Sequence, residues 1–221
     1  SISKSAFFYM GILDYINQNF TQSQNNFLQY SQFYPNDINA HLAIGDIYFA
    51  QQQYLDAIFY YLKVLQIDEQ NLNGKINLAK SMIALQKFSD AEDVLKSIIN
   101  VYPNNFEIFY NLGLCYYALE NYDAAIKKFS QSILLNTSKA EIYYNLGLAY
   151  NQTNAYKQAL EAFSKCIKLD SYNGSAHYEI ANLYKLIFKN ELAITHYRKA
   201  KKTINTPNLN LKLGLLYFDN K

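Results

Sequence analysis

Apolar residues along this chain recur at i, i+3, i+4 and i+7 in successive stretches that are separated by short polar breaks. This spacing places the apolar side chains on one face of an α-helix. The breaks recur regularly, and they lie at residues 51–53, 86–87, 120–121, 153–154 and 189–190. Prolines at 35, 103 and 207 separate longer blocks. The pattern therefore predicts helices in pairs, with a short turn inside each pair.

The pairs belong to a repeat. The segments FYNLGLCY and YYNLGLAY place Gly113 and Gly147 at an offset of 147 − 113 = 34 residues. Steps of 34, with a last step of 33, connect small residues along the chain: Gly11, Gly45, Ala79, Gly113, Gly147, Ala181 and Gly214. A second small residue follows twelve positions later, at Ser23, Ala57, Ala91, Ala125, Ala159 and Ala193. Four residues further on stands a large residue: Phe27, Tyr61, Leu95, Phe129, Phe163 or Tyr197.

Small residues at facing positions let two antiparallel helices approach closely, while large residues fill the space between neighbouring pairs. Because no pair buries its own apolar face, the repeats must stack. We therefore expect an all-α fold, a right-handed superhelical solenoid of antiparallel helix pairs with a concave and a convex side.

The period of 34 and this pattern of small and large positions resemble the tetratricopeptide repeat family. The resemblance covers nearly the whole chain as a single array over 1–221. Six repeats are expected at about 4–37, 38–71, 72–105, 106–139, 140–173 and 174–206, and 207–221 as the first or capping helix of a seventh. The Trp that this family has at position 4 is replaced throughout, by Phe7, His41, Lys75, Phe109, Tyr143, His177 and Asn210.

In that family the first helix of each repeat lines the concave groove, and helical geometry places positions 2, 5, 6, 9, 12 and 13 on this face. Position 6 is Asn77, Asn111 and Asn145 in three consecutive repeats. An amide both donates and accepts, so such a row can pair with the backbone of an extended peptide. The row resembles the asparagine ladder of the O-linked N-acetylglucosamine transferase family. The alternative is that Asn serves packing or capping at this position.

Other residues of the same face complete the predicted peptide-binding site. Tyr110, Tyr144 and Tyr178 at position 5 offer amphipathic contact area or, alternatively, pack within the array. Glu107, Glu141 and Glu179 favour a basic or amide-rich ligand, unless they are ordinary solvated charges. Lys80 and Asn182 occupy position 9.

Composition narrows the function further. The 221 residues are 50% hydrophobic and 17% charged, and 20 Lys and Arg face 18 Asp and Glu, for a net charge of +2. We therefore expect no nucleic-acid partner, since no excess of positive charge is present to bind phosphates. No apolar run reaches the ~18 residues of a membrane helix, so we expect no direct membrane insertion. The compartment is left open.

No catalytic or cofactor motif stands out. Cys115 and Cys166 lie on apolar helix positions, His41 and His177 lie on packing positions, and no Gly-rich phosphate loop occurs. We expect no enzyme activity, no metal and no cofactor. The first hypothesis is a scaffold or adaptor that holds an extended segment of a protein partner along residues 8–185. The second is self-assembly or complex formation through the C-terminal end, where residues 209–218 have an apolar face without a second helix to cover it.

Overall fold

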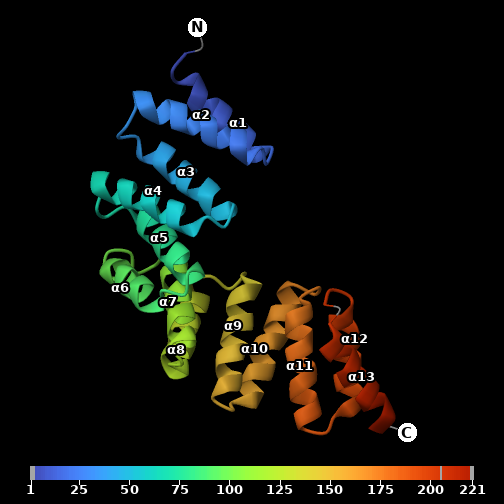
Figure 1. Ribbon diagram of the computed structural model, residues 1–221. Coiled ribbons are helices and arrows are strands. Elements are labelled where there is room, and N and C mark those ends of the chain that lie inside the picture. Colours follow the sequence, from blue (N-terminus) through green and yellow to red (C-terminus); the bar gives the residue numbers. More distant parts are fainter. Residues whose placement is uncertain (1–2, 205, 220–221) are drawn as a thin grey trace. The chain divides into compact units, whose positions relative to one another are not determined.

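The computed structural model describes residues 3–204 and 206–219, and these form thirteen α-helices and no strand (Figure 1). The predicted all-α array of helix pairs is confirmed. Six pairs follow one another along the chain, and a single helix follows the last pair. The bounds of the helices are α1 (Ala6–Ile16), α2 (Phe20–Phe33), α3 (Ile38–Ala50), α4 (Tyr54–Ile67), α5 (Leu72–Ala84), α6 (Phe88–Ile99), α7 (Phe106–Ala118), α8 (Tyr122–Leu135), α9 (Ala140–Gln152), α10 (Tyr156–Leu169), α11 (Gly174–Leu186), α12 (Asn190–Lys201) and α13 (Pro207–Asp219).

The chain divides into two compact units. The N-terminal unit, Ser1–Asn104, holds α1 to α6, and the C-terminal unit, Asn105–Lys221, holds α7 to α13. Odd-numbered helices are the first helices of their repeats, and even-numbered helices are the second. The assignment of 1–221 to one continuous array stays a prediction.

Side-chain caps fix where most first helices begin. Asp37, Asn71, Asn105 and Asn173 each accept a hydrogen bond from a backbone N–H in the first turn of the helix that follows. These N–H groups have no partner inside the helix, so the cap stabilises each start by about 1 kcal/mol. Short polar residues before an apolar run therefore encode these boundaries.

Each first helix ends in a turn of one type. Position 15 of every repeat has a left-handed backbone, with φ near +60° at Gln18, Gln52, Gln86, Glu120, Asn154 and Phe188. In the fourth repeat the N–H of Asn121 donates to the carbonyl of Tyr116 at 2.8 Å, which closes the last turn of α7. Glycine usually occupies such a position because it has no Cβ to strain. None of these six residues is glycine.

The small residues at position 8 do allow close helix approach. A Cβ at Gly147 would lie 2.6 Å from the ring of Phe163, and one at Gly45 would lie 2.6 Å from the ring of Tyr61. Real side chains do not approach so closely, so these glycines are required by the large residue at position 24 of the same repeat. This contact between positions 8 and 24 is the central packing unit of the repeat.

Candidate functional site

The first helices of the C-terminal unit form one continuous surface because side chains connect each helix to the next. Asn145 on α9 donates to the hydroxyl of Tyr110 on α7 at 3.1 Å. Lys212 on α13 donates to the hydroxyl of Tyr178 on α11 at 2.7 Å. Between them, Ser175 on α11 influences the hydroxyl of Tyr144 on α9 and lowers its pKa. In both hydrogen bonds, position 5 of one repeat accepts from position 6 of the next.

The tyrosines at position 5 are half-buried and pack on the aromatic residue at position 24 of their own repeat. Ring centroids are 6.1 Å apart for Tyr110 and Phe129, and 5.8 Å apart for Tyr144 and Phe163. Tyr178 lies 5.6 Å from Tyr197 in the same way. Each tyrosine therefore belongs to the core at its ring and to the surface at its hydroxyl.

The predicted asparagine row lies on these first helices, at different depths. Asn111 is only 4% exposed, and its amide donates to the carbonyl of Glu107 at 2.8 Å. Asn145 is half-buried and also donates to the carbonyl of Glu141 at 2.9 Å. Asn77, in the N-terminal unit, donates to Asp46 at 3.0 Å. The amides of Asn77 and Asn145 therefore connect neighbouring repeats, whereas that of Asn111 bonds within α7, and peptide binding by the same row stays a prediction.

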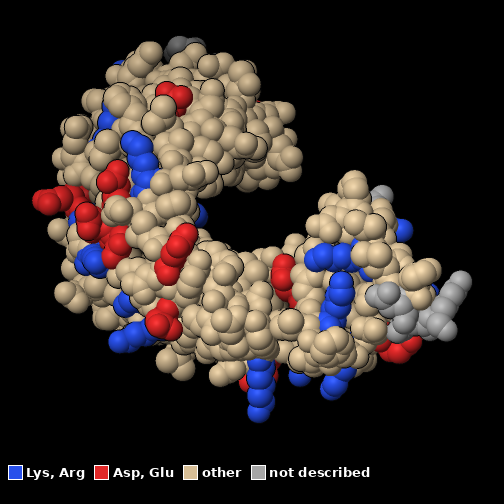
Figure 2. All heavy atoms as spheres, turned by 60° about the horizontal axis from the view of Figure 1, so that its bottom comes forward, with Lys and Arg blue, Asp and Glu red and all other residues tan. Residues whose placement is uncertain are grey.

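Carboxylates lie beside the tyrosine hydroxyls. Burial and then the nearby charge of Glu141 raise the pKa of Tyr110 to about 12. Burial and then the charge of Glu179 raise the pKa of Tyr144, and the Ser175 side chain opposes that shift. The hydroxyls of Tyr110 and Tyr144 therefore stay protonated at neutral pH. The surface of α7, α9 and α11 thus carries neutral phenol groups with glutamate side chains near them. On the face seen in Figure 2, acidic and basic side chains are interspersed among uncharged ones.

Two polar networks were not predicted from the sequence. In the sixth repeat, the hydroxyl of Tyr197 and the ammonium group of Lys212 both donate to Oδ1 of Asn182, at 2.6 and 2.8 Å. The amide nitrogen of Asn182 donates to the carboxylate of Glu179 at 3.2 Å. Asn182 therefore holds α11, α12 and α13 together.

The N-terminal unit has the corresponding network in its second repeat. The hydroxyl of Tyr61 donates to Oδ1 of Asp46 at 2.7 Å, and the amide of Asn77 donates to the same oxygen. Burial raises the pKa of Asp46, while Tyr61, Lys80 and Asn77 oppose that shift. Lys80 also lies over the ring of Phe49, 5.9 Å from its centroid.

The signal for both networks is present in the sequence. Tyr occupies position 24 only in the second and sixth repeats, and only these two have a carboxylate or amide at position 9. The other four repeats have Phe or Leu at position 24, with Ile, Lys or Leu at position 9. A carboxylate or amide at position 9 thus accompanies a hydroxyl at position 24.

The same face of the N-terminal unit is more apolar. Tyr9, Ile12 and Ile16 on α1 are exposed, with Tyr9 at 70%. Leu42 and Phe49 on α3 are half-buried and occupy positions 5 and 12 of the second repeat, which belong to the same predicted face. The two units therefore offer surfaces of different chemistry, apolar on α1 and α3 and rich in tyrosine and carboxylate on α7, α9 and α11.

Metal-ligating side chains do not gather in the described part of the chain. Over residues 3–204 and 206–219, no three His, Cys, Asp or Glu side chains lie close enough to hold a metal ion. Both cysteines are buried, and burial raises the pKa of the Cys166 thiol to about 11. None of the described helices is long and apolar enough to cross a membrane.

Comparison with known families settles the nature of the repeat. Residues 48–112 and 140–173 match family models described as Tetratricopeptide repeat, and residues 115–154 match one described as TPR repeat. Together these matches cover more than half of the chain. The chain belongs to the tetratricopeptide repeat family.

Solved structures share the tetratricopeptide repeat fold at low sequence identity. A chain of the APC/C hetero-tetramer Cut9–Hcn1 is 19% identical with a TM-score of 0.84, and the match covers 97% of this chain and 43% of that one. This chain thus spans less than half the length of that relative. PilF from Pseudomonas aeruginosa is 17% identical with a TM-score of 0.83, over 96% of both chains. A MamA protein is 28% identical with a TM-score of 0.64, over 75% of this chain and 90% of that one.

No curated protein sequence matches this chain significantly. The tetratricopeptide repeat fold is typical of proteins that bind other proteins and of subunits of protein complexes. Members of the family are generally non-catalytic scaffolds. Protein binding is therefore the general activity that the family indicates, and the surfaces described above are where a partner is to be sought.

Proposed function

We propose that this protein is a non-catalytic scaffold that holds an extended segment of a protein partner on its first-helix surfaces. The observation that carries the proposal is the row of tyrosine, asparagine and glutamate side chains on α7, α9 and α11, in which hydrogen bonds connect α7 with α9 and α11 with α13. Surfaces that are rigid before binding lose less entropy when a ligand orders on them. Tyrosine is also enriched among the residues that dominate binding energy.

The ligand that fits the C-terminal unit is a basic or amide-rich segment. Glu141 is exposed, and Glu107 and Glu179 are half-buried on the same face. Peptide N–H groups and the side chains of Lys and Arg donate hydrogen bonds to carboxylates. The Lys and Arg cations also pack on the faces of tyrosine rings. The Asn145 amide, which already bonds to Tyr110, adds an acceptor oxygen to this face.

Affinity capture from source-cell lysate tests the proposal. Wild type is compared with the triple variant Asn77→Ala, Asn111→Ala, Asn145→Ala and with Glu161→Ala, a control on the exposed side of α10. We expect one partner to be held by wild type and by the control and lost from the triple variant. Because the asparagines bond within the array, circular dichroism must show that the triple variant retains its helices. Equal capture by a folded triple variant would remove the asparagine row from the site.

The C-terminal end is a second candidate contact surface. α13 is apolar on both sides, and the side chains of Leu211 and Phe218 on it are 63% and 78% exposed. Exposed apolar patches of this kind mark interaction sites. Sedimentation velocity tests self-assembly through this end: a monomer at high protein concentration would argue against it, and the surface would then serve another protein.

A further inference from the structure

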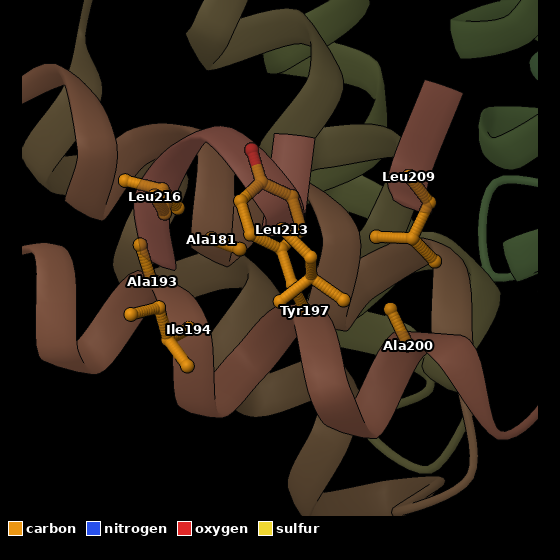
Figure 3. Close-up of a cluster of buried hydrophobic side chains, with 8 residues drawn as sticks. All are labelled: Ala181, Ala193, Ile194, Tyr197, Ala200, Leu209, Leu213 and Leu216. Atoms are coloured by element: carbon orange, nitrogen blue, oxygen red, sulfur yellow. The ribbon is translucent and has the colours of Figure 1, made fainter. Parts of the chain in front are cut away.

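The second helix of each repeat buries one face and exposes the other. In the sixth repeat, Ala193 and Tyr197 of α12 point into the core, as Figure 3 shows. Their equivalents on α4 are Ala57 and Tyr61, which are likewise buried. The opposite face of each second helix carries positions 18 and 22, which are about one turn apart and exposed in all six repeats. This outer face is where the second repeat differs from the others.

In the second repeat the outer face is apolar. Leu55, Phe59 and Leu62, at positions 18, 22 and 25, are 66%, 54% and 44% exposed. The other five repeats have polar or charged residues at positions 18 and 22: Thr21 and Asn25, Ser89 and Asp93, Asp123 and Lys127, Lys157 and Glu161, and Glu191 and Thr195. The first and third repeats flank the second, so this face is not an end of the array. An apolar stripe on an otherwise polar face marks an interaction surface.

Two charged residues border the apolar stripe of Leu55, Phe59 and Leu62. Asp56 and Lys63 are seven residues apart, which is nearly two helical turns, so both lie on the same flank of the stripe. Nζ of Lys63 lies 4.6 Å from the centroid of the Phe59 ring. Neither Asp56 nor Lys63 forms an ion pair within the described residues. Both charges are therefore available to a partner that covers the stripe.

The stripe and its charged flank are complementary to themselves. When two copies of α4 pack antiparallel about a two-fold axis, each flank faces the same flank of the other copy. An axis midway between residues 59 and 60 is equally far from Asp56 and Lys63, so Asp56 of each copy comes level with Lys63 of the other. Residue 62 of one copy is then opposite residue 57 of the other, midway between Leu55 and Phe59. The apolar side chains therefore interdigitate in the same register that pairs the charges.

We propose that this stripe on α4 is a homodimer interface, in which α4 packs antiparallel against α4 of a second copy. Asp56 of each copy pairs with Lys63 of the other, and the two Phe59 rings meet near the axis. A second copy supplies both the apolar spacing and the opposite charges at once. A contact centred on one pair of helices is small, so the dimer is weak and forms in a concentration-dependent equilibrium. The inference is independent of the extended-segment proposal, which concerns first helices.

Charge reversal tests the pairing, with sedimentation equilibrium at micromolar to submillimolar concentrations of the full chain as the measurement. Wild type should show a monomer–dimer equilibrium. Asp56→Lys places two cations on the flank, and Lys63→Glu places two carboxylates there. Each variant alone should therefore dimerise about tenfold or more weakly, because like charges face each other. An equimolar mixture of the two variants should form dimers with about the wild-type affinity, because every cation then faces a carboxylate.

Two further variants separate the interface from general effects of charge and folding. Asp123→Lys is the matched control, because Asp123 is likewise an exposed carboxylate in the first turn of a second helix, α8. It should dimerise as wild type does. Phe59→Gln removes the central apolar contact and should weaken the dimer by about tenfold or more. Since the Phe59 side chain is exposed, circular dichroism should show that the helices of this variant are retained.

A wild-type protein that stays monomeric at every concentration would overturn the inference. A dimer that Phe59→Gln and both charge reversals leave unchanged would also overturn it, because another surface would then form the contact. So would a mixture of folded Asp56→Lys and Lys63→Glu proteins that does not regain dimerisation. Recovery in the mixture excludes misfolding as the cause of the single losses. The Asn77, Asn111 and Asn145 triple variant should dimerise normally, so failure of the extended-segment proposal is distinguished from failure of this one.

Discussion

The second and sixth repeats solve one packing problem in two ways. Both place a tyrosine at position 24 over a small residue at position 8, and both need an acceptor for its hydroxyl. In the second repeat the acceptor is the carboxylate of Asp46, to which the neutral amide of Asn77 also donates. In the sixth the acceptor is the neutral amide of Asn182, to which the ammonium group of Lys212 donates.

The difference shows that the requirement is a hydrogen bond, and that neither network is built as a direct buried ion pair. Partnering the hydroxyl avoids the ~1–3 kcal/mol cost of an unsatisfied buried group, whereas pairing two buried charges gains little after desolvation. The acceptor of the tyrosine hydroxyl is charged in the second repeat and neutral in the sixth, where the charges of Lys212 and Glu179 each bond to the Asn182 amide instead.

Removing the acceptor should have the largest effect. Asp46→Leu leaves the Tyr61 hydroxyl and the Asn77 amide without their partner, and we expect a loss of about 3 kcal/mol in the free energy of unfolding. Adding Tyr61→Phe should recover most of that loss, because Phe with Leu is the combination found at Phe163 and Leu148. Urea unfolding and hydrogen exchange of α3 and α4 measure both. A double variant as unstable as the single one would contradict the network.

The same two repeats differ at positions 4 and 23, and the difference predicts a dependence on pH. In the second repeat His41 lies beside the ring of Tyr60, whereas in the sixth Nδ1 of His177 lies 3.0 Å from Nδ1 of His196. Nε2 of His177 contacts the carbonyl of Ser171, which only accepts, so that nitrogen carries the proton. Nδ1 of His177 then accepts from His196, and two protonated rings cannot keep this bond.

Acidification should therefore weaken the sixth repeat. Burial, then His177 and Lys199, lower the pKa of His196 to about 4, against an ordinary value of 6.5. A lowered pKa in the folded state means that the unfolded chain binds the proton first, so stability falls as the pH drops from 6.5 toward 4. After allowance for solvent screening we expect wild type to lose about 2 kcal/mol more than His196→Phe. Parallel unfolding curves in the two variants across this pH range would contradict the prediction.

Much of the fold could be predicted from the sequence because it depends on spacing. The 34-residue period, the glycines at position 8 and the apolar second face of α13 all follow from residue size and helical periodicity. How deeply each side chain is buried could not be predicted from spacing. Asn111 and Asn145 occupy the same position 6, yet Asn111 is nearly inaccessible, because burial depends on neighbouring repeats that a single-position pattern does not contain.

The networks were missed for a related reason. Asp46 and Asn182 look like isolated polar residues when each position is compared along the chain, and they become meaningful only when position 9 is compared with position 24 of the same repeat. A polar residue opposite a buried hydroxyl is a pairwise signal, and hydrophobic periodicity does not record pairs.

The turns inside the repeats allow another comparison of equivalent positions, with a smaller expected effect on stability. Phe188 and Asn154 have the same left-handed backbone at position 15, and Phe188 is 90% exposed. Asn tolerates this conformation better than a bulky residue does. Phe188→Gly should therefore stabilise the sixth repeat by about 1 kcal/mol, and Asn154→Gly should change the fifth by only a few tenths. Thermal unfolding compares them, and equal shifts would show that backbone strain is not the cause.

The smallest expected effect comes from converting one network into the other. Asp46→Asn gives the second repeat the neutral acceptor of the sixth, with an oxygen still facing Tyr61 and Asn77. Two effects compete, since a charged acceptor forms stronger hydrogen bonds but costs more to bury. The pKa of Asp46 is raised overall, so burial outweighs the hydrogen bonds and Lys80.

A carboxyl whose pKa is raised in the folded state favours folding most when protonated, and that contribution is lost as the pH rises through the folded-state pKa. At pH 7 the wild-type protein therefore carries the cost of a buried charge, and Asp46→Asn should raise stability by up to about 1 kcal/mol. The gain should shrink as the pH falls toward 3.8, where wild type also becomes neutral. Thermal unfolding at both pH values measures the difference. A variant less stable at pH 7 would show that the second repeat depends on the charge itself, and the two networks would then not be interchangeable.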